Sequence, residues 1–194
     1  MLKSKLHKYK LILASGSPRR QQFFKDLGLD FEIRLKEIEE IYPPELKAEE
    51  ITNYLAELKA CAFEGELNDN EILITSDTIV WHNNRPLGKP KDSQDAFDIL
   101  KSLSNATHEV ITSVCFKTHF DSTVIYEVTK VTFNELSDEA ILFYIENYKP
   151  FDKAGAYGIQ EWIGFIGVSK IEGSYANVMG MPTDKVYAYL GTLI

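Results

Sequence analysis

A short run of serines and arginines, Ser15-Gly16-Ser17-Pro18-Arg19-Arg20, is the first segment whose side chains can bind an anion. It follows the apolar, β-prone residues 9–14 and opens a helix pattern, with Ser17 as its cap, Pro18 in its first turn and Gly28 as its stop. Backbone N–H groups and two guanidinium groups then converge at the start of the helix, which suits a phosphate. The segment matches none of the common phosphate-loop fingerprints. The alternative is therefore a capped helix whose two arginines are solvated.

Asp77 interrupts the nearly continuous apolar run of residues 71–81. An ionised carboxylate inside such a strand loses several kcal/mol of solvation unless a cation, a metal or a hydrogen-bond donor compensates it. We therefore expect a positive group to face Asp77. The alternative is a structural aspartate bonded to nearby amides or to Thr78. The loop of residues 88–91 follows closely and supplies Lys89, although lysines on loops are often only solvated surface.

Two further segments carry polar groups that a ligand can use. Residues 152–160, DKAGAYGIQ, are rich in small residues, so their backbone can approach a ligand closely while Gln160 offers an amide. Glu39 and Glu40 lie in an acidic loop and can ligate a hard cation such as Mg²⁺, with solvation as the alternative.

The pattern of apolar residues predicts strands that alternate with helices. Strands are expected at residues 9–14, 31–35, 71–81, 109–120, 123–133 and 165–171, and helices at residues 17–28, 49–64, 93–103, from 137 onward and at 182–190. The adjoining strands at 109–120 and 123–133 indicate an antiparallel hairpin. The sequence therefore predicts an α/β fold with a mixed, twisted sheet and flanking helices, in preference to a purely parallel doubly wound sheet.

Length and composition favour one soluble folding unit over residues 1–194. Apolar residues make up 44% and charged residues 26% of the chain, close to globular averages. No apolar run approaches the roughly 18 residues that a membrane span requires, and no signal peptide is recognisable, so the cytoplasm is expected. A net charge of −8 argues against non-specific nucleic-acid binding. Cys61 and Cys115 are predicted to be buried free thiols.

Five motifs, taken in order and spacing, resemble the Maf nucleotide pyrophosphatases over nearly the whole chain. They are ASGSPRR at residues 14–20, SDT at 76–78, GKPKD at 88–92, DKAGAYGIQ at 152–160 and EGSYANVMGMP at 172–182. The resemblance implies a fold like that of inosine-triphosphate pyrophosphatases, with two lobes around a nucleotide cleft. It also implies a divalent metal, Mg²⁺ or Mn²⁺, and a homodimer.

The resemblance also implies roles for individual residues. Asp77 matches the catalytic aspartate that accepts a proton, and it shares a metal with Glu40 in our hypothesis. Lys89, Lys59 and Glu40 match further polar residues of the cleft, with Lys89 and Glu40 assigned to catalysis. The phosphate loop corresponds to Ser15, Ser17 and Arg20, and the specificity positions to Arg19, Thr78 and Gln160. Residues 156–160, AYGIQ, resemble the branch that acts on dTTP and UTP more than the branch that acts on 7-methyl-GTP.

Two positions depart from the family pattern and leave the base preference open. Glu161 stands where a glycine commonly follows the glutamine, and Ser76 stands where alanine is usual. The expected reaction is hydrolysis of a nucleoside triphosphate to its monophosphate and pyrophosphate. The alternatives are a non-catalytic, nucleotide-sensing regulator of cell division and a purine pyrophosphatase acting on inosine or xanthosine triphosphate.

Overall fold

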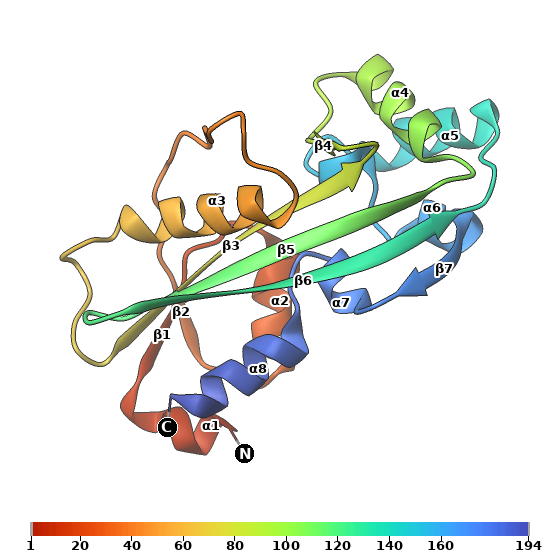
Figure 1. The fold of residues 1–194 in the computed structure, drawn as a ribbon. Coiled ribbons are helices and arrows are strands. Elements are labelled where there is room, and N and C mark those ends of the chain that lie inside the picture. Colours follow the sequence, from red (N-terminus) through yellow and green to blue (C-terminus); the bar gives the residue numbers. More distant parts are fainter. Residues whose placement is uncertain (1, 194) are drawn as a thin grey trace. The chain divides into compact units, whose positions relative to one another are not determined.

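Strands and helices alternate along the chain in the computed structural model, which describes residues 2–193 (Figure 1). The strands are β1 (Lys10–Leu13), β2 (Phe31–Ile33), β3 (Glu71–His82), β4 (Arg85–Leu87), β5 (Thr107–Lys117), β6 (Ser122–Phe133) and β7 (Val168–Glu172). They form a seven-stranded sheet in the order β2-β1-β3-β5-β6-β7, with β4 paired to β3. Parallel and antiparallel pairs both occur, which confirms the predicted α/β fold with a mixed sheet.

Helices connect most of these strands. The α-helices are α1 (Leu2–Lys5), α2 (Pro18–Asp26), α3 (Glu49–Cys61), α4 (Ser93–Leu103), α5 (Asp138–Tyr148), α6 (Trp162–Gly167), α7 (Tyr175–Val178) and α8 (Thr183–Thr192), and the 3₁₀ turns are η1 (Leu6–Lys8) and η2 (Ala154–Ala156).

The chain divides into two compact units. The first comprises Met1–Asp77, Thr112–Glu127 and Gly180–Ile194, and the second comprises Thr78–Ile111 and Val128–Met179. The single domain over residues 1–194 stays a prediction.

In the first unit, β1 pairs in parallel with both β2 and β3. Parallel neighbours need a crossover connection, and α2 supplies it between β1 and β2. Gly28, with φ of 67°, adopts the left-handed conformation that follows the end of this helix. Because β1 and β3 run in the same direction, β1 ends beside Ile74 in the first part of β3, and Ala14 N donates to Ile74 O at 2.9 Å. The turn after β1 is thereby held beside the part of β3 that leads to Asp77.

The sheet of the first unit is buried on both faces, as the continuous apolar pattern of residues 71–81 predicts. On one face, the side chains of β1 and β3 pack against α2 and α8, in a cluster that includes Leu11, Leu13, Ile72, Ile74, Phe24, Val186 and Leu190. On the other face, Ile12 and Leu73 pack with Ala56 and Ala60 of α3. Alternation along β3 places Asp77 on the same side as Leu73, the side that α3 covers.

The second unit has its own apolar core, to which β3, β5 and β6 contribute together with α4 and α5. Here β4 pairs antiparallel with β3, and β7 pairs antiparallel with β6. The chain turns between β3 and β4 at Asn83 and Asn84, which have φ of 50° and 58°. The strand β4 that follows this turn was not predicted from the sequence.

Two sequence predictions are wrong. Residues 165–167 complete α6, and β7 begins only at Val168, so the strand expected at 165–171 is shorter at its start. The helical turn is possible because Gly164 has no side chain: a Cβ there would lie 1.9 Å from the carbonyl oxygen of Ile159. Both cysteines are free, but only Cys115 is buried, whereas Cys61 is exposed at the end of α3.

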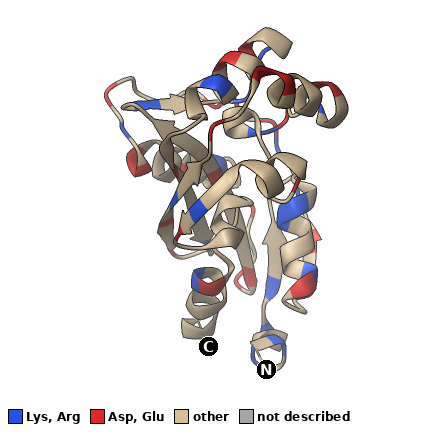
Figure 2. Cartoon of the chain, turned by 90° about the vertical axis from the view of Figure 1, so that its right-hand side faces the viewer, with Lys and Arg blue, Asp and Glu red and all other residues tan. Residues whose placement is uncertain are grey.

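Within residues 2–193, none of the helices is both long and apolar enough to cross a membrane. Figure 2 shows acidic and basic residues interspersed along the helices. With a net charge of −8 spread in this way, a phosphate site must be built from a few locally placed cations.

A network of charges holds the amino-terminal ends of the parallel strands. Glu71, at the start of β3, is 3% exposed, and its carboxylate accepts hydrogen bonds from Arg34 Nη2 at 3.0 Å and from the backbone N–H of Asn68 at 3.1 Å. Lys10 Nζ lies 3.7 Å from the same carboxylate. The hydrogen bond from Arg34, opposed by burial and assisted by Asn68, lowers the pKa of Glu71 to about 2.

We expect this network to contribute stability above pH 4.5 that is lost as the pH falls. Glu71 has an ordinary pKa of 4.5 and takes up a proton in the unfolded chain before it does so in the folded protein. Between pH 5 and pH 3, the wild type should lose about 2 kcal/mol more unfolding free energy than Glu71→Gln, which cannot titrate. Urea unfolding followed by circular dichroism measures the difference. Glu66→Gln, at a more exposed pair with Lys36, is the control and should behave as the wild type. Parallel losses in Glu71→Gln and the wild type would contradict the assignment.

Candidate active site

Hydrogen bonds to two serine side chains hold the turn between β1 and α2 in place. The Ser17 hydroxyl accepts a hydrogen bond from the backbone N–H of Arg20 at 3.5 Å, and Pro18 occupies the first turn of the helix. The hydroxyl of Ser15, which is buried, accepts a hydrogen bond from the backbone N–H of Ser17 at 3.3 Å. The predicted cap at Ser17 is therefore confirmed, and the residues predicted to bind phosphate occupy one tight turn.

Arg20 ties this turn to the end of the neighbouring strand. Its Nε donates to the carbonyl oxygen of Gly180 at 2.9 Å, and its Nη1 donates to the carbonyl oxygen of Ser76 at 2.9 Å and to Ser15 Oγ at 3.5 Å. Burial lowers the pKa of the guanidinium, and the nearby charge of Asp77 opposes that shift. Arg20 thus fixes the geometry around Asp77, while the half-buried Arg19 lies next to it in the first turn of α2.

Asp77 is 7% exposed, and the cation that its burial requires is Lys59. Lys59 Nζ, in the last turn of α3, lies 2.6 Å from Asp77 Oδ1 and 3.5 Å from the carbonyl oxygen of Ser76. The same ammonium lies 2.8 Å from Glu40 Oε1. The expectation that a positive group faces Asp77 is therefore confirmed. Lys59 thereby joins two other predicted residues, Asp77 and Glu40, whose carboxylates approach its nitrogen from separate segments.

The carboxylates of Asp77 and Glu40 are a suitable donor pair for a hard divalent cation. Both approach Lys59 Nζ, so their oxygens lie near one another. Across residues 2–193 there is no cluster of three or more histidine, cysteine, aspartate or glutamate side chains that could hold a metal by itself. Mg²⁺ is commonly held by one or two carboxylates, with water and substrate phosphates completing its octahedron. The two carboxylates fit that arrangement, in which the substrate supplies further oxygens.

In the second unit, the structure brings the loops of Lys89 and Gln160 together. The backbone N–H of Gly155 donates to the carbonyl oxygen of Gly88 at 3.1 Å, so residues 152–160 lie against residues 88–92. Gly155 has φ of 70°, and a Cβ there would lie 2.6 Å from Val80 Cγ2. This close approach requires glycine. Lys89 is exposed, whereas Thr78 and Gln160 are half-buried.

Side chains that sequence reasoning missed anchor the loop of residues 152–160. Tyr157 Oη forms a hydrogen bond with Nε2 of the buried His108 at 2.7 Å. Tyr144 Oη, on α5, accepts a hydrogen bond from the backbone N–H of Gly158 at 3.0 Å. Burial lowers the pKa of His108 to about 3, so the imidazole stays neutral at physiological pH. An isolated histidine or tyrosine gives no signal of such pairing, because its partner lies far along the chain.

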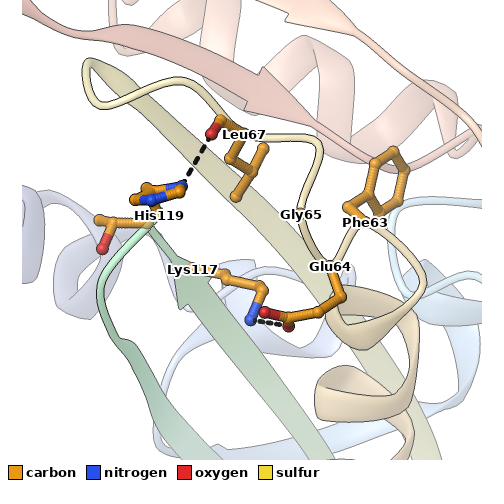
Figure 3. A pocket seen from close by; sticks show the side chains of 7 residues that line it. Phe63, Glu64, Gly65, Leu67, Lys117 and His119 are labelled. Carbon is orange, nitrogen blue, oxygen red and sulfur yellow. Dashed lines mark hydrogen bonds and ion pairs between the residues drawn. The ribbon is translucent and has the colours of Figure 1, made fainter.

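Figure 3 shows a small pocket of the first unit that does not include Asp77, Lys59 or Glu40. Residues of the segment after α3 and of the end of β5 line it: Phe63, Glu64, Gly65, Leu67, Lys117, Thr118 and His119. Lys117 Nζ lies 2.6 Å from Glu64 Oε2, and His119 Nδ1 lies 3.1 Å from the carbonyl oxygen of Leu67. None of the predicted site residues lines this pocket, and its lysine is already paired with a carboxylate.

A family model described as "Maf-like protein" matches residues 10–193. The chain belongs to the Maf family. Curated relatives named dTTP/UTP pyrophosphatase include a protein of Flavobacterium johnsoniae that is 76% identical over 194 residues, which is all of both chains. Another, from Christiangramia forsetii, is 50% identical over all of this chain and 99% of its own length. The Maf resemblance that the sequence motifs indicate is therefore confirmed.

The fold of this Maf protein is similar to that of a solved structure described as the Staphylococcus aureus Ham1 protein. The two share 14% sequence identity, with a TM-score of 0.56 over 95% of this chain and all of that chain. At this identity the likeness concerns the fold alone. It agrees with the predicted α/β architecture of a mixed sheet with flanking helices.

The two departures from the Maf motifs have different structural settings. Ser76 is buried, and within residues 2–193 its hydroxyl has no hydrogen-bond partner, although its carbonyl oxygen accepts from Arg20. Glu161 instead carries a carboxylate that is engaged by other side chains of the second unit. Of these two side chains, only that of Glu161 therefore forms polar contacts within the described residues.

Proposed function

We propose that the protein is a nucleoside triphosphate pyrophosphatase that hydrolyses dTTP and UTP to the monophosphate and pyrophosphate. The observation that carries the reaction type is the buried carboxylate of Asp77, held by Lys59 beside Glu40 and the turn of residues 14–17. The names of the curated relatives support the pyrimidine substrates, in preference to a purine pyrophosphatase or a non-catalytic regulator.

The proposed reaction is attack of water on the α-phosphorus. The water oxygen forms a bond with the α-phosphorus, and the bond from this phosphorus to the bridging oxygen of the β-phosphate breaks. Asp77 orients the water and accepts its proton, and pyrophosphate leaves with the bridging oxygen. Lys59 compensates the charge of the buried carboxylate before substrate arrives, so Asp77 is held in a fixed position.

Cationic and amide groups of the chain are proposed to hold the triphosphate. Arg19, Lys89 and backbone N–H groups of the turn near Ser15 to Ser17 bind its oxygens, while Arg20 keeps the turn beside β3. A divalent metal, Mg²⁺ or Mn²⁺, bound by Asp77 and Glu40 would neutralise charge on the phosphate oxygens. These groups lower the cost of bringing a polyanion to a buried carboxylate.

Gln160 and Thr78 are proposed to read the base. A glutamine amide presents both a donor and an acceptor, which match the edge of a thymine or uracil ring. The family resemblance further supports a homodimer that works in the cytoplasm. Its proposed ligand is a nucleotide, not a nucleic acid or a membrane.

A panel of triphosphates should show this specificity directly. With Mg²⁺ or Mn²⁺, the purified protein should release one pyrophosphate and one monophosphate from each dTTP or UTP. Because a pocket shaped for a pyrimidine ring clashes with the second ring of a purine, we expect ITP, XTP and GTP to react at least about a hundredfold more slowly. Chelation of the metal should abolish turnover. Release of orthophosphate, or a preference for ITP or XTP, would overturn the proposal.

Asp77→Asn should lose turnover far more than nucleotide affinity. The amide keeps the shape of the side chain but cannot accept a proton, so kcat should fall by about 10² to 10⁴. Affinity is measured by calorimetric titration with an α,β-imido nucleotide, which resists cleavage. Asp30→Asn, at an exposed pair with Lys3, is the matched control and should retain full activity. Near-normal turnover in Asp77→Asn would refute the role of Asp77.

A further inference from the structure

The carboxylate of Glu161 is held by two side chains from different parts of the second unit. Tyr144 Oη, on α5, donates to Glu161 Oε2, and Lys153 Nζ lies 3.2 Å from Glu161 Oε1. Lys153 itself is 8% exposed, and its ammonium also lies 2.7 Å from Asp152 Oδ1. We call Tyr144, Lys153 and Glu161 the Glu161 network. It joins Lys153 and Glu161, close to the two ends of the loop of residues 152–161, to a helix outside that loop.

Tyr144 links this network to the middle of the loop. While its hydroxyl donates to Glu161, it also accepts the hydrogen bond from the backbone N–H of Gly158. The ring is fully buried in the apolar core of the second unit, so the hydroxyl has little freedom to move. Burial, assisted by the hydrogen bond to Glu161, raises the pKa of Tyr144, which therefore remains a donor at any working pH.

The side chain of Glu161 also fits closely against the loop backbone. A Cβ on Gly158 would lie 2.8 Å from Glu161 Cδ, so glycine at this position leaves the space that the carboxylate fills. On the other side of Gln160, the Ile159 side chain is 4% exposed and belongs to the apolar core. Both chain neighbours of Gln160 are thus fixed, one by packing and the other by the Glu161 network.

Gln160 has the properties of a group held ready for a ligand. It is half-buried, and within residues 2–193 its side chain forms no hydrogen bond. An amide that must distinguish one base edge from another has to be positioned to a fraction of an ångström by groups whose own conformations are locked. The Glu161 network supplies such support at the residue that follows the amide.

We propose that Glu161, held by Tyr144 and Lys153, is a positioning residue that sets the base selectivity of Gln160. The proposal rests on the proposed function, in which Gln160 reads the base. Glu161 touches no substrate in this role; it acts through the backbone that it shares with Gln160.

The test compares kcat/KM for dTTP with kcat/KM for dCTP, whose base presents the opposite donor and acceptor pattern. In Glu161→Ala, the dTTP:dCTP ratio should fall about tenfold through a higher KM for dTTP, because a small displacement of a binding group costs one to two orders of magnitude. Turnover of dCTP at saturation should stay unchanged. Glu161→Gln, which keeps an acceptor for Tyr144 Oη, should restore most of the ratio. Glu172→Ala, at an exposed pair with Lys170, is the matched control and should behave as the wild type.

A double variant separates positioning from general damage to the fold. If Glu161 acts through Gln160, then Glu161→Ala combined with Gln160→Ala should lower the ratio no further than Gln160→Ala alone. Tyr144→Phe removes the donor to Glu161 and should lower the ratio as Glu161→Ala does. It also replaces Glu161→Ala in the comparison if that variant does not fold.

The outcomes for the two proposals are distinct. A wild-type protein that does not hydrolyse dTTP or UTP defeats the proposed function. A wild type that hydrolyses both, with an unchanged dTTP:dCTP ratio in folded Glu161→Ala or Tyr144→Phe, overturns the positioning role alone. Additive losses in the double variant would also overturn it.

Discussion

The ammonium of Lys59 between the carboxylates of Asp77 and Glu40 is the interaction on which the site depends. A carboxylate that is 7% exposed needs a compensating charge, and Lys59 Nζ provides it at 2.6 Å. Removal of one partner from such a buried pair typically lowers the unfolding free energy by about 3 to 5 kcal/mol. The ion pairs of Lys59 therefore help to hold α3 and the loop that carries Glu40 in place. The same contacts bring an acid, a cation and a second acid to one point.

Sheet topology determines why this set lies beside a phosphate-binding turn. Because β1 and β3 are parallel neighbours, the turn after β1 lies beside the stretch of β3 that leads to Asp77. Arg20 then secures the arrangement through the carbonyl oxygens of Ser76 and Gly180. This guanidinium belongs to the scaffold at least as much as to the substrate site, a distinction that the sequence motif alone does not reveal.

Much of the fold follows from local pattern, whereas the pairing of side chains does not. Strands with continuous apolar runs and helices with clear caps, such as the one at Ser17, were predictable, and the burial of Asp77 predicted a cation. That this cation is Lys59 follows only from the packing of α3 on the sheet. Local apolarity misled at residues 165–167, where Gly164 permits a helical turn, and at Cys61, which lies on the exposed side of α3. Partners such as Tyr144 and Glu161 are seventeen residues apart and carry no sequence signal.

The most direct test of the central claim is a crystal structure with α,β-imido-dUTP and Mg²⁺. If Asp77, Lys59 and Glu40 form the reaction centre, the α-phosphate will lie beside the Asp77 carboxylate with a water between them, in line with the bond to the bridging nitrogen. The outer phosphates will contact the turn of residues 14–17. A nucleotide bound with its triphosphate remote from Asp77 would contradict the assignment.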